Sequence, residues 1–333
     1  MSVQPLNRRH AIVLAAALAA SVPSLSLAQA KIKVAGIYTV PFEQQWAGRL
    51  HTALKAAEAR GEIEYKASEN VSNADYERVM REYATAGNTL IVGEAFAVEA
   101  AARKVAKDFP KVSFLMGSSG KPQAPNFSVF DNYIQEPAYL TGMIAGGMSK
   151  SGKIGFVGGQ DIPLVRKFQC GYEQGAKYVN PKVQSLYAMT GSTNAAWTDP
   201  ARGAELTKAQ IAQGVDVVFS AAGSTGFGIM QAAKDGGILA IGVDSNQNHL
   251  HPGTMLTSMV KRVDVAVYNL AKKTTPGVSS LGLKEGGVDY ALDQHNEKLI
   301  SADMKKKVDA AKADIIAGKI KVADYMADNA CKY

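Results

Sequence analysis

Short apolar runs alternate with helical patterns along almost the whole chain of 333 residues. The first pair is typical. KIKVAGIY has the composition of a strand, and WAGRLHTALKAAEARG then places Trp46, Leu50 and Leu54 on one helical face before Gly61 ends the pattern. Strands that alternate with helices in this way form βαβ units with parallel sheets and right-handed connections. The pattern therefore predicts an α/β fold.

The alternation restarts after residue 150, where SKSGKIGFVGG links a charged, glycine-bearing segment to a new strand. Two such series predict two doubly wound parallel-sheet lobes, residues 31–150 and 151–253, because a chain this long exceeds one core. Residues 254–285 supply a further strand and helix, which we expect to cross back to the first lobe, and residues 286–333 stay unassigned. Ligands bind beyond the carboxyl ends of parallel strands, so the fold predicts a hinge and an interlobe cleft.

Residues 1–30 have the pattern of a cleaved export signal. Arg8 and Arg9 precede an apolar run too short to span a bilayer, and Ala28-Gln29-Ala30 is a small-x-small cleavage site. The adjacent arginines fit twin-arginine export, and ordinary Sec export stays equally open. No cysteine follows the apolar run, so we expect a periplasmic protein without a lipid anchor.

Charge and cysteine content exclude two further classes. The formal charge of +7 is spread out, and its densest run, Lys305-Lys306-Lys307, lies in an amphipathic pattern that predicts a solvated helix face rather than a nucleic-acid patch. The only cysteines are Cys170 and Cys331. A disulfide is permitted in an exported protein, but two distant cysteines make no disulfide framework, and we expect free thiols.

Candidate ligand-binding residues of the first lobe follow its predicted strands. Phe42 and Gln44 follow the first strand, Glu94 and Phe96 follow the third, and Asp131 ends the run NFSVF. A loop aromatic can stack on a flat ligand, and a carboxylate can accept from sugar hydroxyls or from a base N–H. Capping of a helix by Glu94, or of a turn by Asp131, is the alternative.

Trp46, at the start of the first helix, is instead assigned to the core.

The second lobe offers three candidates at equivalent strand ends, and a fourth candidate, Lys261, lies where we expect the chain to cross between the lobes. Trp197 lies in a polar loop ahead of Asp199-Pro200, where a large aromatic favours binding over core. Gly226 lies in AAGSTGFG, Asp244 ends ILAIGVD, and Lys261 follows LTSMV.

Several catalytic patterns are missing from the sequence. There is no Walker lysine motif, GSTGFG is not G-x-G-x-x-G, and no G-x-S-x-G occurs. The histidines of NHLHP have no nearby cysteine or H-E-x-x-H companion and are predicted to form a surface turn. Aromatics, carboxylates, amides and one lysine bind a flat polar molecule but provide no nucleophile beside a base. We therefore expect no enzyme activity, cofactor or metal.

Several blocks resemble the basic membrane protein (BMP) family of ABC transporter substrate-binding proteins, in the purine-nucleoside-binding branch of the type I periplasmic binding fold. They are EPAYLTGMIAGGMSKSGKIGFVGG, GYEQGAKYVNP, DVVFSAAGSTGFGIMQAAKDGG, AIGVDSNQ and LTSMVKRVD, and the resemblance runs from about residue 31 to residue 273. It implies a soluble carrier that closes on a purine nucleoside and passes it to an ABC permease in the inner membrane.

The resemblance also implies roles for single residues. Phe42 and Trp197 match the two aromatics that sandwich the base, although the family usually has Phe at the second position. Asp131 matches the acid of the first lobe. Gly226, Asp244 and Lys261 fall on further binding positions of the family.

One departure leaves the ligand open. Nucleoside-binding relatives usually read D-x-S-F-N-Q in the first loop, whereas YTVPFEQQW keeps the aromatic and Gln44 but lacks the Asp and Asn. Glu94 also stands where a glycine is more usual. The ligand can therefore be a purine nucleoside, a free purine base or a related heterocycle.

Two other functions stay open at this point: a binding protein that presents its ligand to a membrane receptor, and a periplasmic nucleoside hydrolase. We expect a monomer that binds no nucleic acid.

Overall fold

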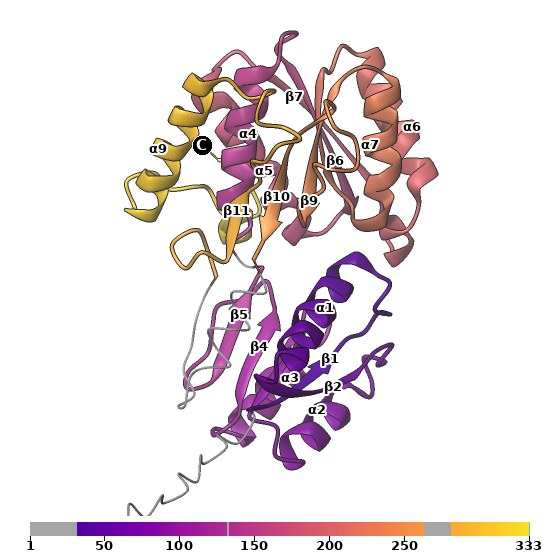
Figure 1. Ribbon diagram of the computed structural model, residues 1–333, viewed down its shortest axis with the longest axis vertical. Helices are drawn as coiled ribbons and strands as arrows, with labels where there is room; N and C mark the ends of the chain where they lie inside the picture. The colour runs from indigo at the N-terminus through magenta and orange to yellow at the C-terminus, as the bar shows by residue number, and fades with distance from the viewer. Residues whose placement is uncertain (1–31, 132, 263–280, 333) are drawn as a thin grey trace, which may run out of the picture. The chain divides into compact units, whose positions relative to one another are not determined.

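The computed structural model describes residues 32–131, 133–262 and 281–332, and two parallel sheets organise them (Figure 1). The export signal expected at residues 1–30 lies outside these residues. None of the described helices is both long and apolar enough to cross a membrane.

The first sheet is fully parallel, with strand order β2-β1-β3-β4-β5. Side chains alternate between its two faces, so Val34, Val92 and Leu115 pack with α1, while Ile91 and Phe114 pack with α2 and α3. The elements are β1 (Ile32–Ile37), α1 (Gln45–Ala59), β2 (Ile63–Ser68), α2 (Tyr76–Thr85), β3 (Leu90–Glu94), α3 (Glu99–Asp108), β4 (Ser113–Gly117) and β5 (Phe127–Phe130).

The second sheet has the order β11-β10-β9-β8-β6-β7, and only the β10–β11 pair is antiparallel. Figure 1 shows α6 and α7 on one side of this sheet and α4, α5 and α9 on the other. The elements are α4 (Gln135–Met148), β6 (Lys153–Gln160), α5 (Pro163–Val179), β7 (Gln184–Gly191), η1 (Asn194–Trp197), α6 (Pro200–Ala212), β8 (Val217–Ala221), η2 (Gly223–Thr225), α7 (Gly226–Asp235), β9 (Leu239–Asp244), β10 (Met255–Lys261), β11 (Val288–Tyr290), α9 (Ala302–Ile316) and α10 (Tyr325–Asp328).

This architecture confirms the predicted α/β fold with two parallel-sheet lobes. The elements lie close to the predicted ranges because most of the strands are buried and most of the helices carry one apolar face. Asp199 caps α6 as the sequence indicates: its carboxylate accepts from the Arg202 backbone N–H at 2.9 Å, and Pro200 is the first helical residue.

Packing differs from the expected lobe ranges in two places. Helix α4 precedes residue 150 but packs on α5 and shares the core of the second sheet, so the change from one core to the other falls between Asp131 and Ile134. Strand β10 pairs with β9 in the second sheet rather than crossing back. Leu281 does pack in the core of the first sheet. The helix expected before it lies mostly in 263–280, outside the described residues.

The expectation of two free thiols is wrong. Cys170 in α5 and Cys331 near the C-terminus form a disulfide, with Cα atoms 5.2 Å apart. The pairing arises because the C-terminal segment returns to α5, where Lys167 forms an ion pair with Asp324 at 3.2 Å. The Gln174 side chain also accepts from the Ala323 backbone N–H at 2.8 Å. Sequence spacing could not show this return.

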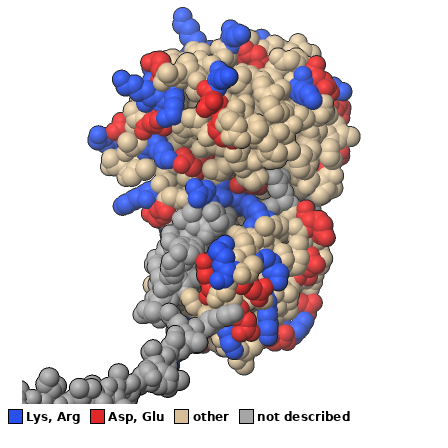
Figure 2. Space-filling model, in the orientation of Figure 1, with Lys and Arg blue, Asp and Glu red and all other residues tan. Residues whose placement is uncertain are grey.

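Lys305, Lys306 and Lys307 are all exposed on α9, as the amphipathic pattern predicts. Lys305 pairs with Asp309 at 2.5 Å and Lys307 with Asp303 at 2.8 Å. Positive and negative side chains intermix over the face shown in Figure 2.

Candidate functional site

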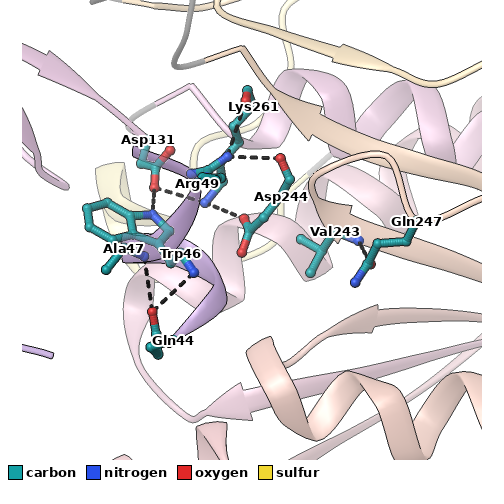
Figure 3. Close-up of polar contacts among 9 residues, drawn as sticks. All are labelled: Gln44, Trp46, Ala47, Arg49, Asp131, Val243, Asp244, Gln247 and Lys261. Carbon is teal, nitrogen blue, oxygen red and sulfur yellow. Dashed lines mark hydrogen bonds and ion pairs between the residues drawn. The ribbon is translucent and has the colours of Figure 1, made fainter. Parts of the chain in front are cut away.

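Three charged residues from the two sheets meet in one buried cluster (Figure 3). Lys261 Nζ lies 2.9 Å from Asp131 Oδ2 and 2.8 Å from Asp244 Oδ1. Asp131 is 3% exposed, Asp244 is 7% exposed and the Lys261 side chain is 6% exposed. We call these three residues the acid–lysine–acid cluster. All three were predicted site residues, and the structure brings them together.

The positions of the strand ends explain why these three residues lie together. Strands β9 and β10 are parallel neighbours with Asp244 opposite Val260, so Asp244 and Lys261 end at the same sheet edge. Asp131 follows the last strand of the first sheet. Both aspartates have a φ of 68°, a left-handed conformation that aspartate tolerates better than most residues. The chain turns at each acid as the strand ends.

Charge compensation makes this burial possible. Burial alone would raise the pKa of Asp244, but the positive charges of Lys261 and Arg49 outweigh it, so the pKa lies below its usual value. Lys261 also lies over the Phe168 ring, 5.4 Å from its centroid. The cluster thus keeps the Asp244 carboxylate ionised at neutral pH.

Trp46, which the sequence assigned to the core, does pack against the core of the first sheet, and it also lies beside this cluster. Its indole N–H donates to Asp131 Oδ2 at 2.6 Å. Its ring stacks on Phe130 at a centroid distance of 5.6 Å and meets Phe96 edge-on at 5.8 Å. Gln44 accepts from the Trp46 and Ala47 backbone N–H groups and so caps α1. Gln44 therefore has a structural role that the sequence did not predict.

Phe42 lies in the loop before α1 and is half-buried. His51 stacks on it at a centroid distance of 3.8 Å, and Tyr38 meets it edge-on at 5.4 Å. These neighbours hold the ring in place. Its role as a stacking surface for a ligand stays a prediction.

Glu94 ends β3 and accepts from the Thr39 backbone N–H at 2.7 Å and from the Thr39 hydroxyl. Burial raises the pKa of Glu94, although the hydrogen bonds from Thr39 act in the opposite direction. The alternative of a helix cap does not fit, because α3 begins only at Glu99 and Val98 holds the capping position.

Trp197 and Gly226 lie at strand ends of the second sheet. Trp197 is half-buried, and its ring covers Gly159 so closely that a Cβ there would clash with it. Gly226 begins α7 beside Ser220, whose Oγ would lie 2.6 Å from an added Cβ. Packing already accounts for a glycine at 226. Ligand contacts by both residues stay predictions.

Arg49 is the residue that sequence reasoning missed. Its Nη1 donates from α1 to the backbone carbonyls of Asp244 at 2.9 Å and Lys261 at 3.2 Å. A pocket of about 710 Å³ beside the cluster has Arg49, Asp244 and Lys261 in its lining. In the sequence, the only signal for Arg49 was its position three residues after Trp46, which places both side chains on the same face of α1.

Among the described residues, no group of three or more His, Cys, Asp or Glu side chains could hold a metal ion. His249 is exposed in the turn after β9, as predicted for NHLHP.

The sequence and the fold both match known substrate-binding proteins. The model of the family described as ABC transporter substrate-binding protein PnrA-like matches residues 34–325. The ABC transporter nucleoside-binding protein BmpA of Lactococcus lactis subsp. cremoris is 31% identical over 274 residues, which cover 75% of this chain and 76% of that protein. A purine-binding protein of Brucella abortus is 33% identical over 302 residues, covering 88% of this chain and 83% of that protein.

Solved structures agree. A solute-binding protein of an ABC transporter system from Aeropyrum pernix K1 superposes with a TM-score of 0.73 at 27% identity, covering 88% of this chain and 93% of that one. One from Conexibacter woesei has a TM-score of 0.69 at 20% identity, covering 88% and 99%, and supports the fold alone. These matches confirm the resemblance in the sequence: the chain belongs to the Bmp family of PnrA-like ABC transporter substrate-binding proteins.

Proposed function

We propose that this substrate-binding protein captures a purine nucleoside or a free purine base between its lobes and delivers it to an ABC permease. The observation that carries the proposal is the acid–lysine–acid cluster, in which strand ends of both sheets contribute charged groups to one place. The nucleoside- and purine-binding relatives support the ligand class.

The chemistry of the cluster suits such a ligand. Carboxylate oxygens accept from base N–H groups or from a pair of ribose hydroxyls, and the lysine ammonium donates to ring nitrogens or carbonyl oxygens. Phe42 from the first lobe and Trp197 from the second are the proposed stacking partners. Aromatic stacking adds about 0.5–1.5 kcal/mol per pair beyond the area buried.

The first loop leaves nucleoside and base both open. Phe42-Glu43-Gln44 replaces the Asp- and Asn-containing sequence usual in nucleoside-binding relatives, and Gln44 caps α1. Glu94, with its raised pKa, and Phe96, against Trp46, are the further proposed contacts at this end.

We place the protein in the periplasm after removal of residues 1–30, as a monomer that carries its ligand unchanged. The cluster favours a carrier over a hydrolase because the charges of Lys261 and Arg49 outweigh burial and hold the pKa of Asp244 below its usual value, which makes this carboxylate a weak general base.

A thermal-shift panel of purine bases, nucleosides, pentoses and amino acids tests the proposal, on protein freed of co-purified ligand by unfolding and refolding. We expect purine compounds alone to raise the melting temperature, because a ligand that binds only the folded state stabilises it. A shift with a sugar or an amino acid and none with any purine would refute the proposed ligand class.

A further inference from the structure

Arg49 contacts the second lobe with only part of its guanidinium. Nη1 makes both hydrogen bonds, to the carbonyl oxygens of Asp244 and Lys261. Nε and Nη2 are buried and have no hydrogen-bond partner among the described residues. A buried donor without a partner is costly, and two on one side chain are unusual.

These two donors form one edge of the guanidinium. In arginine, the N–H of Nε and one N–H of Nη2 point the same way and form a fork that matches two adjacent acceptors. The bound Nη1 lies away from this edge and fixes the plane of the group. Arg49 is therefore anchored through Nη1, with its guanidinium carbon 6.0 Å from the centroid of the Trp46 ring, and keeps a two-donor fork beside the cluster (Figure 3).

The charges around the Arg49 fork indicate whether its ligand is a neutral acceptor or an anion. Two cations, Arg49 and Lys261, face two carboxylates, Asp131 and Asp244. A ligand that brings a further negative charge would unbalance the set in a buried place, whereas a neutral ligand with two adjacent acceptors would not. The arrangement favours carbonyl and ring-nitrogen acceptors over a carboxylate.

We propose that Arg49 is a specificity-determining residue that selects purines with a 6-oxo group over purines with a 6-amino group. The inference rests on the proposed function. The O6 and N7 atoms of a 6-oxopurine are adjacent acceptors, and arginine binds this pair through two parallel N–H bonds. A 6-aminopurine presents a donor and an acceptor at the same edge, which matches the amide of Asn or Gln instead.

Isothermal titration with two matched pairs, hypoxanthine with adenine and inosine with adenosine, tests this. The members of each pair differ only in the 6-substituent and in whether N1 carries a hydrogen. The comparison therefore isolates the 6-position whether the protein binds the free base or the nucleoside. The wild-type protein should bind the 6-oxo member at least about tenfold more tightly. Arg49→Gln should abolish or invert that preference. Arg49→Lys keeps the charge but loses the fork, and should reduce the preference.

Arg78→Gln is the matched control, because Arg78 lies on α2 with 60% of its side chain exposed and, among the described residues, pairs only with Asp75 and Glu82. It should leave the preference unchanged. Circular dichroism and the melting temperature show that each variant is folded. The inference would be overturned by equal affinity for both members of a pair in the wild type, or by an unchanged preference in Arg49→Gln. It would also be overturned if orotate, a planar heterocycle that carries a carboxylate, bound more tightly than hypoxanthine. Absence of binding in both pairs and with guanosine would instead refute the proposed function.

Discussion

Replacing Lys261 by methionine should destabilise the protein by stranding a buried acid. Lys261 Nζ lies 2.8 Å from Asp244 Oδ1, and both side chains are nearly inaccessible to solvent. Removing one partner of a buried ion pair costs about 3–5 kcal/mol, because the other charge stays buried without compensation. Arg49 also stabilises the negative charge of Asp244, so we expect the lower end, about 3 kcal/mol.

Urea unfolding followed by circular dichroism measures this loss at pH 7. The rescue variant is Lys261→Met combined with Asp244→Asn, which removes the stranded charge of Asp244, while Asp131 keeps the hydrogen bond from the Trp46 indole N–H. It should recover most of the lost free energy of unfolding, because two apolar or neutral groups do not carry the cost of an unpaired ion. A loss of unfolding free energy below about 1 kcal/mol, which is the range of exposed ion pairs, would refute the claim that Lys261 compensates a buried charge. Failure of the double variant to recover would refute it as well.

The pH dependence gives a second check on the same pair. In the wild type the pKa of Asp244 is lowered, so its contribution to stability is present above about pH 4 and is lost as the pH falls through the folded-state pKa. Without Lys261, burial should raise the pKa of Asp244 above its unfolded value. The free energy of unfolding of Lys261→Met should then increase as the pH falls from 7 to 5. In the wild type, the Lys261–Asp244 pair produces no such increase. An unchanged slope between these pH values would contradict the assignment.

Four further variants, at three positions, test other parts of the account. Cys331→Ser opens a cross-link between residues 161 apart, and its unfolding free energy should fall by up to about 5 kcal/mol in urea titrations of oxidised protein; no change would refute a stabilising disulfide. Gly175→Ala places a methyl group against the Tyr139 carbonyl between α4 and α5 and should cost about 1–3 kcal/mol, also in urea; a neutral effect would show that the helices can separate freely. Trp197→Ala should weaken purine binding at least about tenfold in titration calorimetry, while Trp197→Phe retains most of it; unchanged affinity with a large fall in melting temperature would show a purely structural ring.

Much of the fold was readable from the sequence because local patterns specify it. The apolar run Leu239–Asp244 and its neighbours each fit only a buried strand, and α6 begins where Asp199-Pro200 predicts. The acid–lysine–acid cluster was also accessible, since Asp131, Asp244 and Lys261 each follow a strand. Parallel strands bring Asp244 and Lys261 to one edge of the second sheet, and Asp131 joins them from the end of β5 in the first sheet.

The remaining features depend on contacts between distant segments. Helix α4 is buried on nearly every side, so its sequence has no polar face to indicate which sheet it joins. The Cys170–Cys331 disulfide needs the return of the C-terminal segment to α5. Arg49 is one cation among many on a helix, and its role follows only from carbonyl oxygens nearly 200 residues away in the chain. Periodicity carries no information on such pairings.

The central claim is that the cluster receives a purine, and equilibrium titration calorimetry tests it most directly. Refolded protein without co-purified ligand would be titrated with adenosine, guanosine, inosine, adenine and hypoxanthine, and Lys261→Met would be titrated in parallel. The account predicts saturable binding of one molecule per chain for at least one of these compounds, and markedly weaker binding by the variant. Absence of binding heat with all five, from protein shown to be folded, would contradict it.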